Sequence, residues 1–164
     1  MTTTITGAAG IDNIQAATGA VLQVVSSPVT TAYAMTSTSF INIGSLAITP
    51  KNASSKILVT TTNHVYVNSW ANNGWRGAKF RLLRGTTVLY GDVGADPYGE
   101  GAWIENDGDR WMTYSTHHYM DSPNTTATVT YNLEYAIRLA GQEIHINQSA
   151  YGSQGSVTLM EIAG

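Results

Sequence analysis

The chain has 164 residues, of which 12% are charged and 43% are hydrophobic, and it contains no cysteine. Eight Lys and Arg against eleven Asp and Glu give a formal net charge of -3, which argues against a nucleic-acid-binding surface. The lack of cysteine excludes disulfides, thiolate metal sites and a cysteine nucleophile. No run approaches the roughly 18–20 apolar residues of a membrane span, so no membrane partner is expected. The length suits a single domain.

Residues 1–20 are rich in Thr, Ala and Gly, and they lack the basic and apolar regions of a secretion signal. Their side chains are too small to build a core alone. We interpret residues 1–20 as an N-terminal arm or stem that orders against something else, with a frayed terminus as the alternative. Residues 21–164 form the predicted domain.

From residue 21 onward the hydrophobic pattern has a period of two, which is typical of half-buried antiparallel strands. The clearest case is 128–139, where Val129, Tyr131 and Leu133 share one face with Tyr135, Ile137 and Leu139. Other predicted strands cover 21–25, 39–49, 56–67, 78–84, 86–90, 110–120, 143–148 and 156–162. Turn residues separate them, as at Thr49-Pro50-Lys51-Asn52. No stretch has a helical stripe, so the sequence predicts an all-β antiparallel sandwich of the jelly-roll type.

Two segments interrupt this pattern, at 68–77 and 91–109, and they concentrate aromatic residues among Asn, Asp and Gly. Aromatic faces beside amides and carboxylates suit recognition of a sugar or a protein. We predict a receptor-binding surface there, made by Trp70, Trp75, Arg76, Tyr98 and Trp103, with Tyr90 set beside it. The alternative is that these aromatic side chains roof the sandwich as a satellite core.

No assembled catalytic or metal site is evident, so no enzyme activity and no cofactor are expected. Glu100, Glu105, Asp107 and Asp109 are most simply solvated loop acids, and a calcium loop around Asp107 lacks its bidentate Glu. Of the four histidines, His117 and His118 fall on opposite faces of one strand and cannot chelate one ion easily. His64 and His145 could approach each other across strands, but no carboxylate-rich spacing supports a metal site.

Several stretches resemble a family of bacteriophage tail-fibre proteins. The matching residues are GAVLQVVSS (19–27), ITPKNASSKILV (48–59), RLLRGTTVLYGD (81–92), YMDSPNTTATVTYNLEY (119–135) and TLMEIAG (158–164). The resemblance implies a fibre-tip module, a trimeric β-sandwich similar to the tumour-necrosis-factor and C1q jelly rolls. It implies a non-enzymatic protein of the virion, made in the host cytoplasm, with other tail proteins and a host-surface glycan or protein as partners.

Family members usually carry a long shaft before the module, whereas about 20 residues precede it here. Such an arm spans about 65 Å at most when fully extended. The alternative is therefore a capsid decoration protein, whose arm fixes it to the major capsid protein.

The second faces of two predicted strands are too apolar for open solvent. Leu58 and Tyr66 lie on one of them, and Met112, Tyr114 and Met120 lie on the other. Large apolar patches usually mark interfaces, which favours a homotrimer. The alternative is a monomeric sandwich in which both faces are buried.

Overall fold

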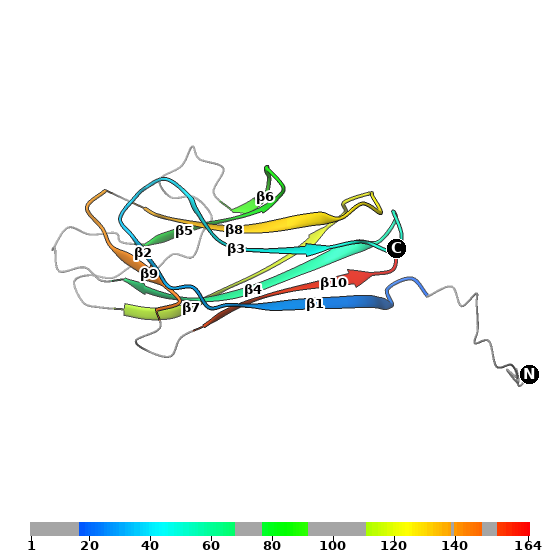
Figure 1. Ribbon diagram of the computed structural model, residues 1–164, viewed down its shortest axis with the longest axis horizontal. Coiled ribbons are helices and arrows are strands. Elements are labelled where there is room, and N and C mark those ends of the chain that lie inside the picture. Colours follow the sequence, from blue (N-terminus) through cyan, green and yellow to red (C-terminus); the bar gives the residue numbers. More distant parts are fainter. Residues whose placement is uncertain (1–16, 68–76, 92–110, 139, 149–153) are drawn as a thin grey trace, which may run out of the picture.

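A computed structural model describes residues 17–67, 77–91, 111–138, 140–148 and 154–164, apart from the side chain of Trp111. The regular secondary structure of the described residues consists of β-strands (Figure 1). The strands are β1 (Val21–Val29), β2 (Tyr33–Met35), β3 (Ile41–Ile48), β4 (Lys56–Val67), β5 (Ala78–Arg84), β6 (Thr87–Gly91), β7 (Trp111–Asp121), β8 (Val129–Ile137), β9 (Ile144–Ile146) and β10 (Gly155–Ile162).

The strands form two antiparallel sheets that lie in two layers (Figure 1). Sheet A has the order β1-β10-β4-β9-β2, with β7 also paired to β4, and sheet B has the order β3-β8-β5-β6. Strand β9 pairs with Val65–Val67 of β4, and β10 continues along β4 from Thr62 to Lys56. Likewise β1 pairs with β10 and β2 pairs with β9. Sheet A is therefore four strands wide, and two of its strands are interrupted.

This pairing is that of a jelly roll. When β1/β2 and β9/β10 each count as one strand, the chain has eight strands. Sheet A then has the order first, eighth, third, sixth, and sheet B has the order second, seventh, fourth, fifth. Two four-stranded sheets linked in this way are the double Greek key of a jelly roll. The predicted fold class is confirmed.

The strand predictions are confirmed within a few residues at each end, with two differences. Strand β1 extends to Val29 and includes Pro28, which is tolerated because β1 is an edge strand of sheet A. The three-residue strand β2 was not predicted. Such a short segment offers too little alternation to be recognised.

The core lies between the two sheets. Its largest fully buried side chains include Phe80, Tyr131 and Tyr135 of sheet B, and Ile57 and Leu159 of sheet A. Each comes from the inward phase of its strand. Their burial removes large apolar areas from water, which is the main favourable term for folding in a chain without disulfides.

An ion pair with an added hydroxyl group joins the two layers at the end of β7. The Arg84 guanidinium donates to both carboxylate oxygens of Asp121, at 2.9 and 2.8 Å. The Tyr131 hydroxyl donates to Asp121 Oδ2 at 2.7 Å. Asp121 belongs to sheet A, whereas Arg84 and Tyr131 belong to sheet B, so this cluster ties the sheets together.

The two ends of the sandwich differ in what they carry. At one end, Gly19 and Ala20 exchange backbone hydrogen bonds with Ala163, so the start of β1 lies beside the last residues of the chain. The C-terminus is therefore tied into sheet A. The 12-residue β4 separates this end from the opposite one by about 35 Å.

Candidate interaction surfaces

The outer face of sheet A is the surface formed by the outward side chains of β1, β10, β4 and β7. An apolar row crosses it. Val24 pairs with Met160, Met160 with Leu58, and Leu58 with Met120. Val24 is 53% exposed and Met120 is 46% exposed, while the two central side chains are half-buried. These four side chains form a continuous apolar band from one edge of the sheet to the other.

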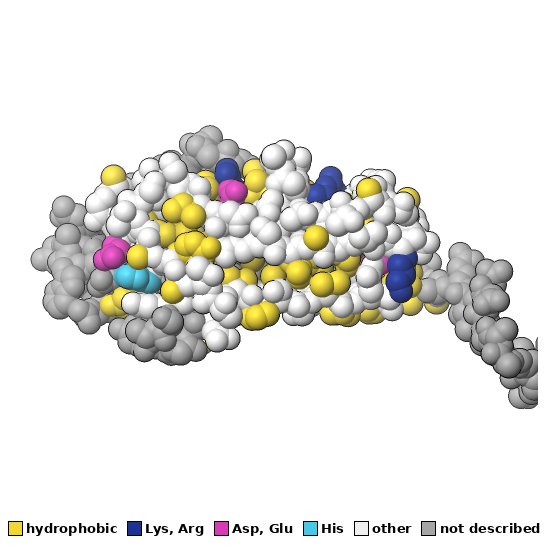
Figure 2. All heavy atoms as spheres, viewed as in Figure 1, with side chains coloured by type: hydrophobic (Ala, Val, Ile, Leu, Met, Phe, Trp, Pro, Cys, Tyr) yellow, Lys and Arg dark blue, Asp and Glu magenta, His cyan; other side chains and the backbone are white. Residues whose placement is uncertain are grey.

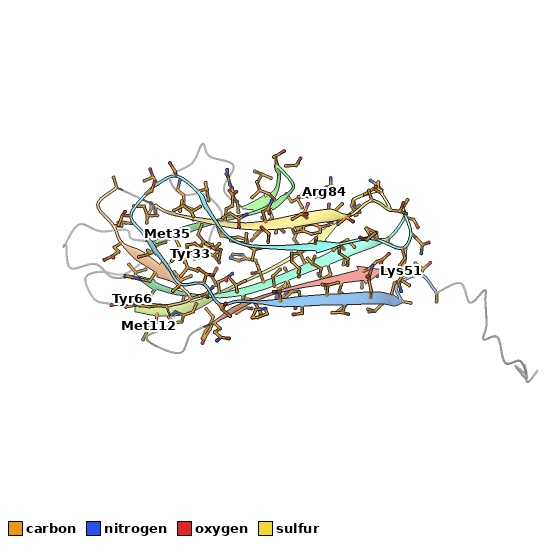
Figure 3. The ribbon with its side chains drawn as sticks, viewed as in Figure 1. Tyr33, Met35, Lys51, Tyr66, Arg84 and Met112 are labelled. Atoms are coloured by element: carbon orange, nitrogen blue, oxygen red, sulfur yellow. The ribbon has the colours of Figure 1, made fainter. Side chains whose placement is uncertain are left out.

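A second apolar group lies on the same face toward the opposite end of β4 and β7. Met112 and Tyr114 are 50% and 61% exposed. Their register partners are Tyr66 and His64, which are buried, and the Tyr114 ring meets the His64 ring edge-on at 5.4 Å. Figure 3 shows Tyr66 and Met112 together on the lower layer, far from Lys51. Between the two groups lie Thr, Ser and His side chains.

Alternation correctly placed Leu58 and Tyr66 on the outward face of one strand, and Met112, Tyr114 and Met120 on that of another. Tyr66 is nevertheless buried. Val24 and Met160 were not identified as part of the same surface. Both occupy outward positions of their strands, so the alternation in 21–25 and 156–162 could have predicted that they point away from the core. Their alignment into one row depends on the register between strands, which one sequence does not reveal.

The outer face of sheet B has a different chemistry. Arg81 forms an ion pair with Glu134 at 2.6 Å, and its guanidinium lies 4.1 Å from the centre of the Phe40 ring. Ser45 donates to Asn132 at 2.7 Å, and Asn132 donates to the Gly85 carbonyl at 2.8 Å. These polar groups are matched within one chain, so the two outer faces are not equivalent. Figure 2 shows hydrophobic side chains reaching the surface along the layer that contains β1.

The predicted receptor-binding residues Trp70, Trp75, Arg76, Tyr98 and Trp103 lie outside the described residues, as do the loop acids considered for hydrolysis and calcium. The strand ends that flank these segments are described. Val67 pairs with Trp111, and Ala78 pairs with Ile137. Three of the four flanking ends therefore lie at the end of the sandwich opposite Gly19 and Ala163 (Figure 1).

Tyr90 is a different case, because the structure places it against the core. Its ring lies 6.3 Å from Phe80, 5.7 Å from His117 and 6.1 Å from Tyr119. Tyr90 is half-buried and packs against the core. Strand β6 pairs with β5 through Leu82 and Tyr90, which holds this residue beside the sandwich interior.

The histidines do not form a metal site in the described part of the chain, where no group of three potential ligands occurs. His117 and His118 lie on opposite faces, as predicted. His117 stacks on Phe80 between the sheets, whereas His118 Nδ1 is 3.1 Å from Thr60 Oγ1 on the outer face of sheet A. His145 is the register partner of Tyr66, and Glu143 contacts it at 3.4 Å.

A buried chain of polar groups surrounds His117. The Tyr135 hydroxyl donates to Ser115 Oγ at 3.1 Å, and Ser115 Oγ is 2.7 Å from His117 Nε2. With its oxygen already accepting from Tyr135, Ser115 can give its own proton to a neutral imidazole. Burial, with a further effect of His118, lowers the pKa of His117 to about 4. Burial also raises the pKa of Tyr135 to about 12. Both groups are neutral at pH 7, so these buried hydrogen bonds join uncharged side chains.

The lowered pKa of His117 makes stability depend on pH. Unfolded histidine has a pKa near 6.5, so between pH 6.5 and 4 the unfolded chain binds more protons and acid favours unfolding. From pH 7 to 5 we expect His117 to account for a loss of about 1–2 kcal/mol in the free energy of unfolding, a figure reduced for the ring's partial exposure.

Urea titrations of the wild type and of His117→Gln at both pH values measure this difference. The variant should lose less stability between pH 7 and 5 than the wild type does. Equal losses in the two proteins would show that His117 is not the group responsible.

No protein-family model matches the chain, and no curated protein matches it. Among solved structures, the chain is similar to a chain in the structure of infectious bursal disease virus strain Gx, with 13% identity and a TM-score of 0.43. It is also similar to the D431N mutant VP2 protein of this virus in T=1 particles, with 10% identity and a TM-score of 0.41. These alignments cover 97% of the chain but only 42% and 41% of the viral chains. At such TM-scores they define neither a family nor a function. No helix among the described residues is long and apolar enough to cross a membrane.

Proposed function

We propose that this chain is a non-enzymatic structural protein of a bacteriophage particle, a homotrimeric tail-fibre-like tip that attaches to the host surface. The observation that supports it best is the polarity of the jelly roll. Gly19, near the start of the domain, meets Ala163 at one end, and three of the four strand ends that flank the aromatic segments, at Val67, Ala78 and Trp111, lie at the opposite end. The fourth, Gly91, pairs with Arg81 within β5. An attachment tip needs this separation between the end held by the particle and the end that meets the cell.

The resemblance to phage tail-fibre proteins supports the same function. Its matching stretches fall on strands and turns that the structure describes. They include the β3–β4 turn, where the Glu161 carboxylate accepts from the backbone N–H of Lys51 at 2.8 Å and from Gln23 Nε2 at 2.6 Å. These contacts join the turn to both β1 and β10. The shared residues therefore build the scaffold.

The second candidate is a capsid decoration protein that is anchored by residues 1–20. The same polarity favours it, because an arm that leaves one end can bind a shell while the other end faces outward. Immunogold microscopy of purified phage particles, with antibody against this chain, separates the two functions. Label at the fibre tips supports attachment, label over the shell supports decoration, and particles without label contradict both.

Host binding is expected to depend on the aromatic segments. The double substitution of Trp75 and Trp103 by Ala should reduce staining of host cells by fluorescent protein at least tenfold, since aromatic side chains dominate recognition surfaces. Oligomeric state and melting temperature should stay unchanged. Thr130→Ala, an exposed position on sheet B, is the control and should bind as the wild type does.

If the double variant instead unfolds or melts much earlier, the tryptophans act as a satellite core. Normal staining by a folded double variant would exclude these two residues from the receptor-binding surface.

A further inference from the structure

We propose that a second copy of this chain covers the outer face of sheet A, with the row Val24, Met160, Leu58 and Met120 at the contact. The inference gives the proposed homotrimer its contact surface, and it rests on the proposed function for the number of copies. The first argument is exposure. Val24, Met112, Tyr114 and Met120 are each between 46% and 61% exposed on one face. Grouped exposure of this kind marks an interface, whereas scattered apolar residues do not.

The second argument is charge. At the described strand positions that point outward from sheet A there is no carboxylate, and Lys56 is the one Lys or Arg. Glu143, in the turn before β9, contacts His145 at the far end of the face. Around a three-fold axis the copies of one face converge and bring identical charges near one another, so a charged face repels its copies and a neutral one does not. The sheet with Arg81 and Glu134 on its outer face lacks this property.

The third argument is size. The face is four strands wide, at about 4.8 Å per strand, and about 27 Å long from Met112 to Met120, a flat footprint of about 500 Å². Accessible area exceeds the footprint because the side chains project from the sheet. The face therefore approaches the scale of a stable interface, which buries about 800 Å² on each partner.

The row can pack against a second copy without a change in the fold. Leu58 and Met160 are already half-buried between their neighbours, and the side chains at the two edges of the row are the exposed ones. Methionine is flexible enough to fill an irregular contact. The Thr and Ser side chains beside the row carry no charge. Their hydroxyl groups are already hydrogen-bonded within the sheet, Ser26 to Thr158 and Thr62 to Thr116.

The test uses sedimentation velocity of the full chain from about 1 to about 100 μM, because a self-association constant depends on protomer concentration. We expect the wild type to be an oligomer. Met120→Glu and Val24→Glu should each raise the dissociation constant at least about 100-fold, since each places an unpaired carboxylate in an apolar contact. Ala47→Glu, at an exposed position on the outer face of sheet B, is the matched control and should sediment as the wild type does.

Two results overturn the inference. One is a wild type that stays monomeric at every concentration, and the other is a folded Met120→Glu protein with the mass of the Ala47→Glu control. Circular dichroism and melting curves establish that the variants are folded. An oligomer that survives Met120→Glu and still stains cells would leave the proposed function standing without this interface. A protein that associates through this face but is absent from particles would support this interface and contradict the proposed function.

A second measurement uses the absence of cysteine. The single thiol of Met120→Cys should react with a maleimide at least tenfold more slowly as protein concentration rises, while the thiol of Ala47→Cys should react at a constant rate. Protection that does not depend on concentration, and that disappears when residues 1–16 are deleted, would show that the chain's own arm covers the face. That result would also overturn the inference.

Discussion

Replacing Asp121 with alanine is expected to lower the free energy of unfolding by about 3–5 kcal/mol, because it leaves a partly buried guanidinium without its partner. The carboxylate of Asp121 accepts two bonds from Arg84 and one from Tyr131, and its side chain is 6% exposed. These contacts join sheet A to sheet B, so their loss also weakens the packing of the two layers. Urea titration at pH 7 measures the effect.

The matched control is Glu134→Ala. Glu134 also pairs with an arginine, Arg81, at 2.6 Å, but both belong to sheet B and lie on its outer face. The Arg81 and Glu134 side chains are 27% and 17% exposed and join no second layer, so this variant should lose less stability than Asp121→Ala does. Equal losses for Asp121→Ala and Glu134→Ala would contradict the view that the ion pair between the sheets is the stabilising one.

Substitution of Phe80 by alanine should cost about 3–5 kcal/mol, the range for a large core side chain that leaves a cavity. Phe80 is fully buried, stacks on His117 with ring centres 3.9 Å apart, and lies 5.1 Å from the ring of Tyr135. The cavity would open between the sheets, next to the polar chain of Ser115 and His117. Chemical denaturation and the melting temperature both report the loss.

The chain offers its own control, since it has two phenylalanines. Phe40 is half-buried beneath Arg81 on the outer face of sheet B, so Phe40→Ala should cost about 1 kcal/mol or less. A Phe80→Ala protein that is no less stable than Phe40→Ala would contradict the assignment of Phe80 to the centre of the core.

Alternation in the sequence predicted most of the strands, because one face of each strand is buried against the other sheet. The segment 56–67 is one example, since its inward residues Ile57, Val59 and Val65 are all buried. The order of the strands in the two sheets follows from pairings between residues far apart in the chain, such as Val24 with Met160. The jelly roll was therefore predicted as a class, and the pairing itself was not.

The interaction surfaces were predicted less completely. Strand alternation placed Leu58 and Met120 on outward faces, but it did not show that they are neighbours in one row. The packing of Tyr90 against Phe80 and His117 was not predicted, because it depends on how the two sheets face each other. The five predicted receptor-binding residues stay a prediction, since they lie outside the described residues.

The hydrogen bonds that Gly19 and Ala20 form with Ala163 have a practical consequence. A peptide or fluorescent protein fused after Gly164 would emerge beside the start of β1 and about 35 Å from the strand ends at Val67 and Trp111. A scaffold with both tethering points at one pole can be grafted onto a surface or a foreign fibre while its other pole stays free to carry inserted sequences.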